Sequence, residues 1–378
     1  MIYIILGTRA QLVKMAPVIR EIEYRNWPLV LIHTGQHKEG IEELKSDFQI
    51  KTDWQWLYSK DQEVKTISHA FKWLLSLISA IILKPNSLLA GLNSFENNII
   101  LVHGDTFSTI LGALLGKRIG IKVAHVESGL RSFNFLNPFP EEINRIITFY
   151  LADIAFCPGQ WAVNNLNKYK KLIKIDTENN TLLDSLKIAL DFPYRNNNYP
   201  VPTANYGVVS IHRFENIFYS TRFKSIIDQL IEVADKHHLI FVLHPTTHKR
   251  LIRSGLIENL NQHPGIELRE RTGYINFIHL LVKSQFVITD GGSNQEELSY
   301  LNIPTFLMRK TTERQEGLGS NVQIGNISAD NLRKFIRETK THSNKQLSLP
   351  INSPSRIICN EIAFATTNFN YPLKHIDP

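Results

Sequence analysis

Cysteine is scarce in this chain of 378 residues, in which Cys157 and Cys359 are the only two. Their wide separation argues against a disulfide framework and against a metal site built from cysteines. The longest apolar stretch, Trp73 to Leu83, is interrupted by two serines, ends at Lys84-Pro85 and is too short to span a bilayer. Met1 to Leu6 has neither the basic flank nor the cleavage site of a signal peptide. These absences predict a protein of the cytoplasm.

Long runs of one charge are also absent, although the net charge is +7. The basic residues occur as separated pairs such as Lys170-Lys171 and Lys249-Arg250, which is typical of solvated helix faces and not of a nucleic-acid-binding stripe. A small phosphorylated ligand fits this charge at least as well as a nucleic acid or a membrane surface.

Short apolar runs alternate with segments of helical period, which is the pattern of βαβ units and a parallel sheet. A chain of this length is also too long for one ordinary core. We therefore expect an α/β fold of two Rossmann-like domains with a central cleft. The expected strands are Ile2–Leu6, Leu29–His33, Ile99–His103, Lys122–Val126 and Ile154–Cys157 in the first half, and Gly207–Ile211, Leu239–Leu243, Gly265–Leu268, Phe286–Thr289 and Thr305–Met308 in the second.

The boundary between the domains is expected in the polar, proline-bearing stretch from Phe192 to Asn205, which cannot continue a helix. This places an N-terminal domain at residues 1–190 and a C-terminal domain at residues 200–350. The final segment, residues 351–378, is expected to pack back on the N-terminal domain.

Ligands of open α/β sheets collect at the carboxyl ends of parallel strands, so the residues that follow each strand are the informative ones. Gly7-Thr8-Arg9 follows the first strand and suits an anion, although a lone glycine more often marks a plain turn, and Lys14 a solvated helix face. Asp105 and Glu127 each follow a strand and form a pair suited to proton transfer. Glu141 begins a helix just after the Glu127 loop. Each carboxylate alone would more often cap a helix or complement its dipole.

In the second half, His212-Arg213 follows a strand. A histidine in this position is more often structural, yet one that faces phosphates could stabilise a leaving group. Asp290-Gly291-Gly292-Ser293 exposes backbone amides at a helix start and predicts a second anion site. Glu297, one turn later, could accept hydrogen bonds from both hydroxyls of a ribose.

The order of these motifs resembles one family, the non-hydrolysing UDP-N-acetylglucosamine 2-epimerases. The combination is far more specific than any one motif and reaches from near the first residue to about Arg314, with a weaker match at Ser355-Arg356. The matching stretches are Gly7-Thr8-Arg9, Lys14-Met15-Ala16-Pro17, Thr34-Gly35-Gln36-His37, Val102-His103-Gly104-Asp105-Thr106, His125-Val126-Glu127-Ser128-Gly129-Leu130-Arg131, Pro140-Glu141-Glu142-Ile143-Asn144-Arg145, Asn180-Thr181 with Asp184, His212-Arg213 with Glu215-Asn216, Gln295-Glu296-Glu297, and Met308-Arg309 with Thr312-Glu313-Arg314.

The resemblance implies a GT-B-like fold, usually a homodimer, and a UDP-sugar substrate that is converted without NAD or a metal. The C2 proton would be removed and UDP would leave C1 to give a 2-acetamidoglucal. Reprotonation from the other face and return of UDP would complete the epimerisation. The family also suggests a role in supplying precursors of surface polysaccharides.

Roles carry over by motif. Asp105, Glu127 and Glu141 become the acid/base candidates, and which of them removes the proton stays open. His212 and Arg9 would stabilise the departing diphosphate, and Lys14 would lie at the reacting sugar. The residues implied to bind the UDP-sugar are Arg9, Arg145, Arg213, Gly291, Gly292, Ser293 and Glu297.

The stretch at Gln36 and His37 resembles one that binds a second substrate molecule as an activator in regulated family members. The alternative is a loop in which these two side chains satisfy neighbouring backbone groups.

Three departures from the family pattern bear on the substrate more than on the reaction class. Ala10-Gln11 replaces Pro-Glu, Asp290-Gly291-Gly292-Ser293 replaces Asp-Ser-Gly-Gly, and Gln315 replaces a proline. The nearest alternative is therefore a 2-epimerase of another UDP-2-acetamido sugar, such as a diacetamido uronic acid, which Gln11 and the stretch Ser132-Phe133-Asn134 would suit.

Other readings are weaker. A hydrolysing relative is disfavoured by His103-Gly104-Asp105 and Glu127-Ser128-Gly129. A GT-B glycosyltransferase would need an acceptor. A non-catalytic sugar-nucleotide binder is disfavoured because all three carboxylates and His212 are present.

Overall fold

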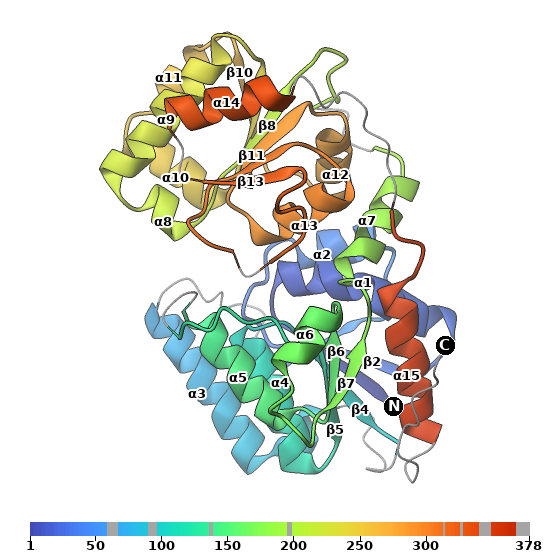
Figure 1. Ribbon diagram of the computed structural model, residues 1–378. Helices are drawn as coiled ribbons and strands as arrows, with labels where there is room; N and C mark the ends of the chain where they lie inside the picture. Colours follow the sequence, from blue (N-terminus) through green and yellow to red (C-terminus); the bar gives the residue numbers. More distant parts are fainter. Residues whose placement is uncertain are drawn as a thin grey trace. The chain divides into compact units, whose positions relative to one another are not determined.

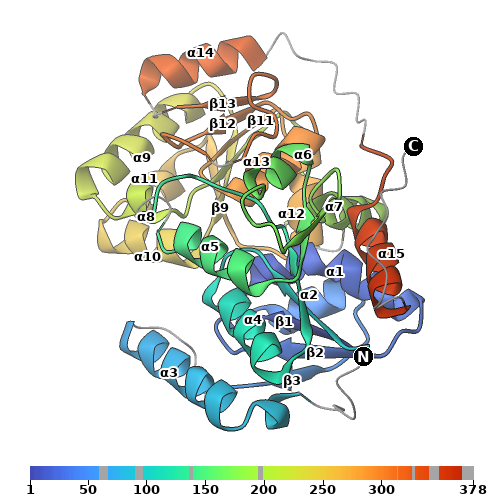
Figure 2. The ribbon, with the colours of Figure 1, turned by 60° about the horizontal axis from the view of Figure 1, so that its bottom comes forward.

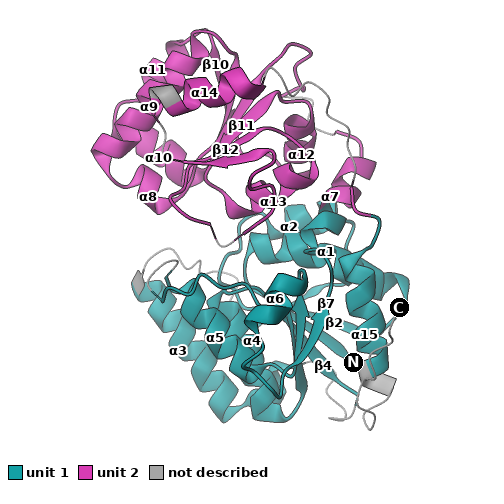
Figure 3. Cartoon of the chain, viewed as in Figure 1, with its two compact units in different colours: residues 1–185, 351–378 teal, residues 186–350 magenta. Residues whose placement is uncertain are grey.

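The computed structural model describes residues 1–58, 67–89, 97–135, 139–194, 199–312, 314–325, 328–339 and 349–367. The chain divides into two compact units, one of residues 1–185 with the C-terminal segment from residue 351, and one of residues 186–350 (Figure 3). Each unit contains a parallel sheet with helices on both faces, which confirms the predicted α/β class of two Rossmann-like domains (Figure 1). Within the expected linker, residues 195–198 lie outside the described residues.

The described part of the first unit contains seven parallel strands in the order β3-β2-β1-β4-β5-β6-β7. The central strands are runs of mostly Ile, Leu and Val that are buried along their whole length, as expected for strands between two helix layers. The sequence did not predict β3 or β7, the two edge strands. The strands are β1 (Ile2–Leu6), β2 (Leu29–His33), β3 (Trp54–Trp56), β4 (Ile99–His103), β5 (Lys122–Val126), β6 (Ile154–Cys157) and β7 (Ile173–Asp176).

Helices cover both faces of this sheet. The C-terminal helix α15 packs against α1 on one face together with α2, whereas α3, α4 and α5 lie on the other (Figures 1 and 2). The helices that belong to this unit or end it are α1 (Arg9–Tyr24), α2 (Ile41–Asp47), α3 (Ile67–Leu83), the short 3-10 helix η1 (Pro85–Leu88), α4 (Phe107–Ile119), α5 (Glu141–Leu151), α6 (Gln160–Asn165), α7 (Leu182–Asp191) and α15 (Pro354–Thr367).

Two glycines allow α4 to approach the sheet closely. A Cβ atom on Gly112 would lie 2.7 Å from a side-chain carbon of Val102, and one on Gly116 would lie 2.4 Å from a side-chain carbon of Val123. Thr106 precedes the helix, and its hydroxyl accepts a hydrogen bond from a first-turn backbone N–H, which satisfies one of the free donors of the helix start. The start of α4 is therefore held beside the carboxyl end of β4.

The described part of the second unit contains six parallel strands in the order β10-β9-β8-β11-β12-β13. The sequence did not predict β13, a short edge strand. The strands are β8 (Gly207–Ser210), β9 (Leu239–Leu243), β10 (Ile266–Glu270), β11 (Phe286–Thr289), β12 (Thr305–Leu307) and β13 (Val322–Ile324). The helices are α8 (Phe214–Ile217), α9 (Ser220–Ala234), α10 (Pro245–Arg253), α11 (Ile257–Gln262), α12 (Tyr274–Val282), α13 (Gly292–Tyr300) and α14 (Ala329–Thr339).

The strand order reverses direction once in each sheet, between β1 and β4 in the first unit and between β8 and β11 in the second. Ligands of doubly wound sheets bind at the carboxyl ends of the strands on either side of such a point. The motifs that the sequence singled out follow these strands. Among the helices that the structure describes, none combines the length and the apolar character needed to cross a membrane.

Candidate functional site

A buried ion pair lies where β4 and β5 end. Nζ of Lys14 is 2.5 Å from Oε1 of Glu127, and Nε2 of His103 is 3.1 Å from Oε2 of the same carboxylate. The Lys14 and Glu127 side chains are only 4% and 6% exposed. Lys14 is therefore not on a solvated helix face, and Glu127 is held between two nitrogen-bearing side chains.

The backbone at Glu127 has an unusual conformation for a residue with a side chain. Its φ is +61°, in the left-handed region, and Gly129 two residues later has φ +84°. A Cβ on Gly129 would lie 2.3 Å from the carbonyl oxygen of Ala162, so only glycine fits there. A non-glycine residue in this region costs about 1–3 kcal/mol, and such strain concentrates at functional sites. The strained turn aims the Glu127 carboxylate back over Gly104, where a Cβ would lie 3.6 Å from Oε2.

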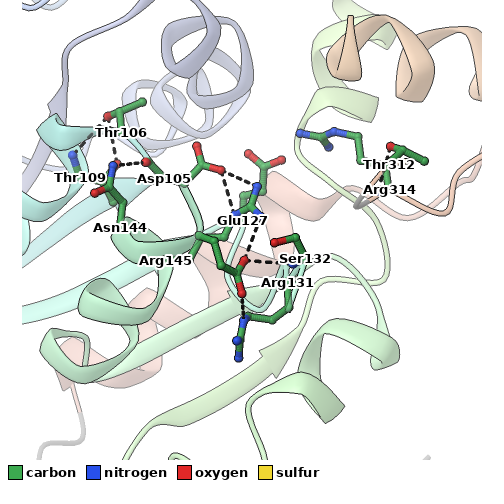
Figure 4. Close-up of polar contacts among 12 residues, drawn as sticks. Asp105, Thr106, Thr109, Glu127, Arg131, Ser132, Asn144, Arg145, Thr312 and Arg314 are labelled. Carbon is green, nitrogen blue, oxygen red and sulfur yellow. Dashed lines mark hydrogen bonds and ion pairs between the residues drawn. The ribbon is translucent and has the colours of Figure 1, made fainter. Parts of the chain in front are cut away.

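Asp105, the residue after Gly104, forms a second ion pair. Nη2 and Nε of Arg145 lie 2.6 and 2.9 Å from its Oδ2, so Oδ1 is outside this pair (Figure 4). Asn144 donates to the backbone carbonyl of Asp105 at 2.8 Å. The Asp105 side chain is 28% exposed, whereas that of Arg145 is 4% exposed. Arg145, which the resemblance implies as a contact of the UDP-sugar, is thus the ion-pair partner of Asp105.

The sequence pointed to Glu141 in the start of α5, but its neighbour Glu142 is the fully buried one. Glu142 accepts from Nε of Arg131 at 2.5 Å and from the Ser132 N–H at 3.0 Å, and it also pairs with Arg145 at 3.3 Å (Figure 4). Burial alone would raise the Glu142 pKa, but the Ser132 N–H and the two guanidinium groups together lower it. Glu142 thereby anchors the loop that carries Glu127 to the helix that carries Glu141. Glu141 itself is partly buried.

A neutral histidine supports the same strand ends. His125 is completely buried, and its Nε2 lies 2.7 Å from the carbonyl oxygen of Gly104. Burial lowers the pKa of His125 to about 4, so the ring is uncharged at neutral pH. It links the end of β5 to the glycine between His103 and Asp105.

In the second unit, an imidazole ring and two guanidinium groups lie around the start of α13. A Cβ on Gly291 would lie 3.2 Å from Cε1 of His212, and one on Gly292 would lie 3.1 Å from Nε of Arg314 and 3.6 Å from Nη1 of Arg309. The free backbone N–H groups of a helix start and its dipole favour an anion, and here Ser293 is in that first turn. The sequence had predicted the glycines and His212, whereas Arg309 and Arg314 appeared only within a family motif.

The two arginines are held in place by their own partners. Nη1 of Arg314 lies 2.6 Å from the buried carboxylate of Glu296, and Nη1 of Arg309 donates to the Thr312 hydroxyl at 3.2 Å; Figure 4 includes Thr312 and Arg314. Glu313, between them in the family motif, lies outside the described residues.

Glu297, the expected ribose partner, is 3% exposed on α13. It lies close to the hydroxyl of Tyr274, whose pKa is raised well above its ordinary value by burial first and by the Glu297 charge second. Arg213 pairs with Glu215 at 2.6 Å, which places its guanidinium beside α8.

Comparison with known proteins decides the family. The family model described as UDP-N-acetylglucosamine 2-epimerase matches residues 20–350. A UDP-N-acetylglucosamine 2-epimerase of Methanocaldococcus jannaschii is 33% identical over 356 residues, which cover 91% of this chain and 92% of that protein. The chain belongs to the UDP-N-acetylglucosamine 2-epimerase family. A crystal structure of the M. jannaschii UDP-GlcNAc 2-epimerase in complex with UDP-GlcNAc and UDP is similar with a TM-score of 0.79 and 28% identity, covering 96% of this chain and 99% of that one.

A relative that is named for another substrate is almost as similar. The UDP-2,3-diacetamido-2,3-dideoxy-D-glucuronate 2-epimerase of Pseudomonas aeruginosa is 32% identical over 340 residues, which cover 85% of this chain and 87% of that protein. Similarity to members of the 2-epimerase family therefore extends to enzymes of two different UDP-sugars.

Gln11, one of the departures from the family pattern, has a structural role. It is buried, accepts from the Gly7 N–H at 2.9 Å and donates to the carbonyl of His103 at 2.7 Å. A carboxylate could not donate to that carbonyl. These contacts tie the turn after β1 to the end of β4, so they give no support to Gln11 as a contact for an unusual sugar.

Three other predicted residues, Arg9, Gln36 and His37, also have partners within the protein. Nη1 of Arg9 lies 3.5 Å from Glu43 of α2, where the guanidinium packs against Gly40. Oε1 of Gln36 accepts from the hydroxyl of Ser108 at 2.7 Å, and the backbone N–H of His37 donates to the carbonyl of Gly7. The sequence could not show these pairings, because each partner comes from another element.

Proposed function

We propose that this chain interconverts UDP-N-acetylglucosamine and UDP-N-acetylmannosamine. The observation that carries the proposal is the pair of held carboxylates after β4 and β5, Asp105 with Arg145 and Glu127 with Lys14. The anion site at the start of α13 supplies the second requirement of the reaction, which is stabilisation of the departing diphosphate. No step in this route uses a redox cofactor, because the hydrogen at C2 leaves and returns as a proton.

The reaction begins with removal of the C2 proton of the sugar. A carboxylate among Asp105, Glu127 and Glu141 takes the proton, the C1–O bond to UDP breaks, and the electron pair of the C2–H bond forms the C1–C2 double bond of 2-acetamidoglucal. A proton from a carboxyl group on the other face then returns to C2, and UDP adds back at C1. Both bonds that were broken are restored, and only the configuration at C2 has changed.

The groups of the second unit act on the diphosphate. Negative charge grows on its oxygens as the C1–O bond breaks, and donors fixed at that place stabilise the transition state more than the ground state. Such donors are the ring of His212, the backbone N–H groups at Gly292 and Ser293, and the guanidinium groups of Arg309 and Arg314. Glu297 holds the ribose and contributes equally to both states.

The test is conversion of UDP-N-acetylglucosamine by the purified protein alone, followed by proton NMR of the anomeric signals. The expected result is a mixture with UDP-N-acetylmannosamine, without free sugar. Asp105→Asn keeps the size of the side chain and removes its charge, so this variant is expected to lose the activity while it still binds UDP. Accumulation of free N-acetylmannosamine, or no conversion by the folded wild-type protein, would refute the proposal.

The second candidate substrate is a UDP-2,3-diacetamido uronic acid, because the P. aeruginosa relative with that name is almost as similar as the others. Both sugar nucleotides are to be supplied to the same enzyme preparation. A value of kcat/KM that is higher for the uronic acid would reassign the substrate and leave the reaction class intact. Either activity would fit a cytoplasmic enzyme that supplies precursors of surface polysaccharides.

We also propose a homodimer, supported by an apolar stripe on α3. Phe71, Leu75 and Ile82 are 63%, 47% and 56% exposed, and Ile78 lies between them, so apolar residues follow the spacing of a helix that packs on another helix. Light scattering should give twice the chain mass for the wild-type protein. Leu75→Glu is expected to yield a monomer, whereas Lys72→Glu, a matched control on a neighbouring exposed position, is expected to remain dimeric. A wild-type protein that is monomeric at micromolar concentration would refute this assembly.

A further inference from the structure

Asp290 is a completely buried carboxylate that has no role in the reaction proposed above. It follows β11 directly, and β11 pairs with β8, which leads into His212. Its oxygens accept from the backbone N–H of His212 at 3.0 Å, from that of Arg213 at 3.0 Å and from Nδ2 of Asn216 at 2.9 Å. A carboxylate without such donors would be costly to bury, so these contacts show why it can be accommodated.

The same carboxylate also reaches the imidazole ring of His212. Nδ1 of the ring lies 3.2 Å from Oδ1 of Asp290, the oxygen that also accepts from the His212 backbone N–H. One oxygen therefore contacts both the backbone and the ring of this residue. The His212 side chain is 37% exposed, whereas Asp290 is not exposed at all.

Two further neighbours lie beside the ring. Its Cε1 faces Gly291 at the start of α13, and the ring of His244 lies tilted beside it with centroids 5.3 Å apart. With Nδ1 directed at Asp290, Nε2 is the nitrogen left to face a ligand at the α13 start. A carboxylate that accepts from one ring nitrogen of a histidine fixes which atoms carry protons and where the other nitrogen points.

We propose that Asp290 is the positioning residue of His212: it accepts the Nδ1–H of the ring and so leaves Nε2 aimed at the diphosphate of the bound sugar nucleotide. Nε2 donates to the diphosphate when the ring carries a proton on both nitrogens. Asp290 does not touch the substrate and transfers no proton. The inference rests on the proposed function for the identity of the ligand. The orientation and protonation of the ring are independent of it.

The first test compares Asp290→Asn with wild type in steady-state kinetics. Groups that orient metal-binding histidines contribute about 10–100-fold in affinity or activity. By analogy, kcat is expected to fall by at least ~10-fold while KM changes little. Asp184→Asn is the matched control. Asp184 is also a buried carboxylate, and it accepts from the hydroxyl groups of Ser353 and Ser355 in the first unit. This control should lower the melting temperature and leave kcat unchanged.

A double-mutant cycle separates positioning from general stabilisation. When His212 is already alanine, Asp290→Asn is expected to lower kcat little further, because the two residues act through one group. Losses of kcat that multiply in the double variant would overturn the proposal.

The second test needs neither substrate nor turnover. Nitrogen-15 spectra of the imidazole rings in the ligand-free wild type, assigned by comparison with His212→Ala, are expected to show a protonated Nδ1 on His212. A His212 ring with an unprotonated Nδ1 in the wild type would overturn the proposal, even if Asp290→Asn does not fold. If these spectra agree but neither UDP-sugar is converted, the proposed function fails and the positioning by Asp290 stands.

Discussion

Replacing Lys14 by methionine is expected to destabilise the first unit strongly. The ammonium group lies 2.5 Å from Glu127, and both side chains are less than a tenth exposed, so solvent cannot compensate the charge that remains. Removing one partner of a buried ion pair costs roughly 3–5 kcal/mol, because the other charge stays buried without its counterpart. Methionine retains most of the volume of lysine, so a packing defect adds little.

The double variant Lys14→Met/Glu127→Gln provides the internal control. It carries neither charge, and neutral replacement of a whole buried pair is often close to neutral in stability. We therefore expect it to recover most of the free energy of unfolding that Lys14→Met loses. Both variants should be inactive as epimerases, and both should bind UDP as the wild type does, because the anion site belongs to the second unit.

Urea unfolding followed by tryptophan fluorescence measures the stability of the first unit, which contains Lys14 and Glu127. All five tryptophans lie in the first unit: Trp27, Trp54, Trp56, Trp73 and Trp161. The reasoning is refuted if Lys14→Met unfolds at the same urea concentration as the wild type. It is also refuted if the double variant is as unstable as the single one.

Four further predictions concern other groups. His212→Ala is expected to lower kcat by ~10²–10³-fold with a much smaller change in KM; a destabilised variant with full turnover would remove His212 from the mechanism. Glu297→Ala should weaken UDP binding by about 1.5–3 kcal/mol in calorimetry, and an unchanged affinity would make it a helix residue only. If the loop at Gln36 and His37 binds an activating substrate molecule, alanine there alters sigmoidal kinetics, whereas hyperbolic kinetics that both variants leave unaltered favour a structural loop. The folded-state pKa of Glu142 is lowered, so its contribution to stability is present above the ordinary pKa of 4.5 and is lost as the pH falls through the lowered pKa. Glu142→Gln should therefore remove part of the acid dependence of the free energy of unfolding measured in urea. Parallel curves of this free energy against pH for the variant and the wild type would contradict the reasoning.

The central strands could be predicted from the sequence because they are buried on both faces. β1, β4 and β11 are almost entirely apolar and are buried along their whole length, which no surface helix would show. The edge strands β3 and β7 were missed because they are short and only partly buried, so they carry no such run.

The candidate site was predictable as a set of positions but not as a set of contacts. The sequence correctly placed these residues at the carboxyl ends of the strands where the strand order reverses, because the topology alone determines which residues lie at that edge of the sheet. The pairing of Arg145 with Asp105 depends on where α5 lies, which no local pattern reveals. Glu142 was passed over because acids in a first helical turn ordinarily serve the helix dipole.

The measurement that tests the central claim most directly is the fate of the C2 hydrogen in deuterated water. UDP-N-acetylglucosamine is incubated with the enzyme alone, and the product is examined by proton NMR before equilibrium is reached. Removal of the C2 proton by a carboxylate and return of a proton from another group predict deuterium at C2 of essentially every molecule of UDP-N-acetylmannosamine formed. Product that retains its original hydrogen at C2 would contradict elimination and re-addition of UDP.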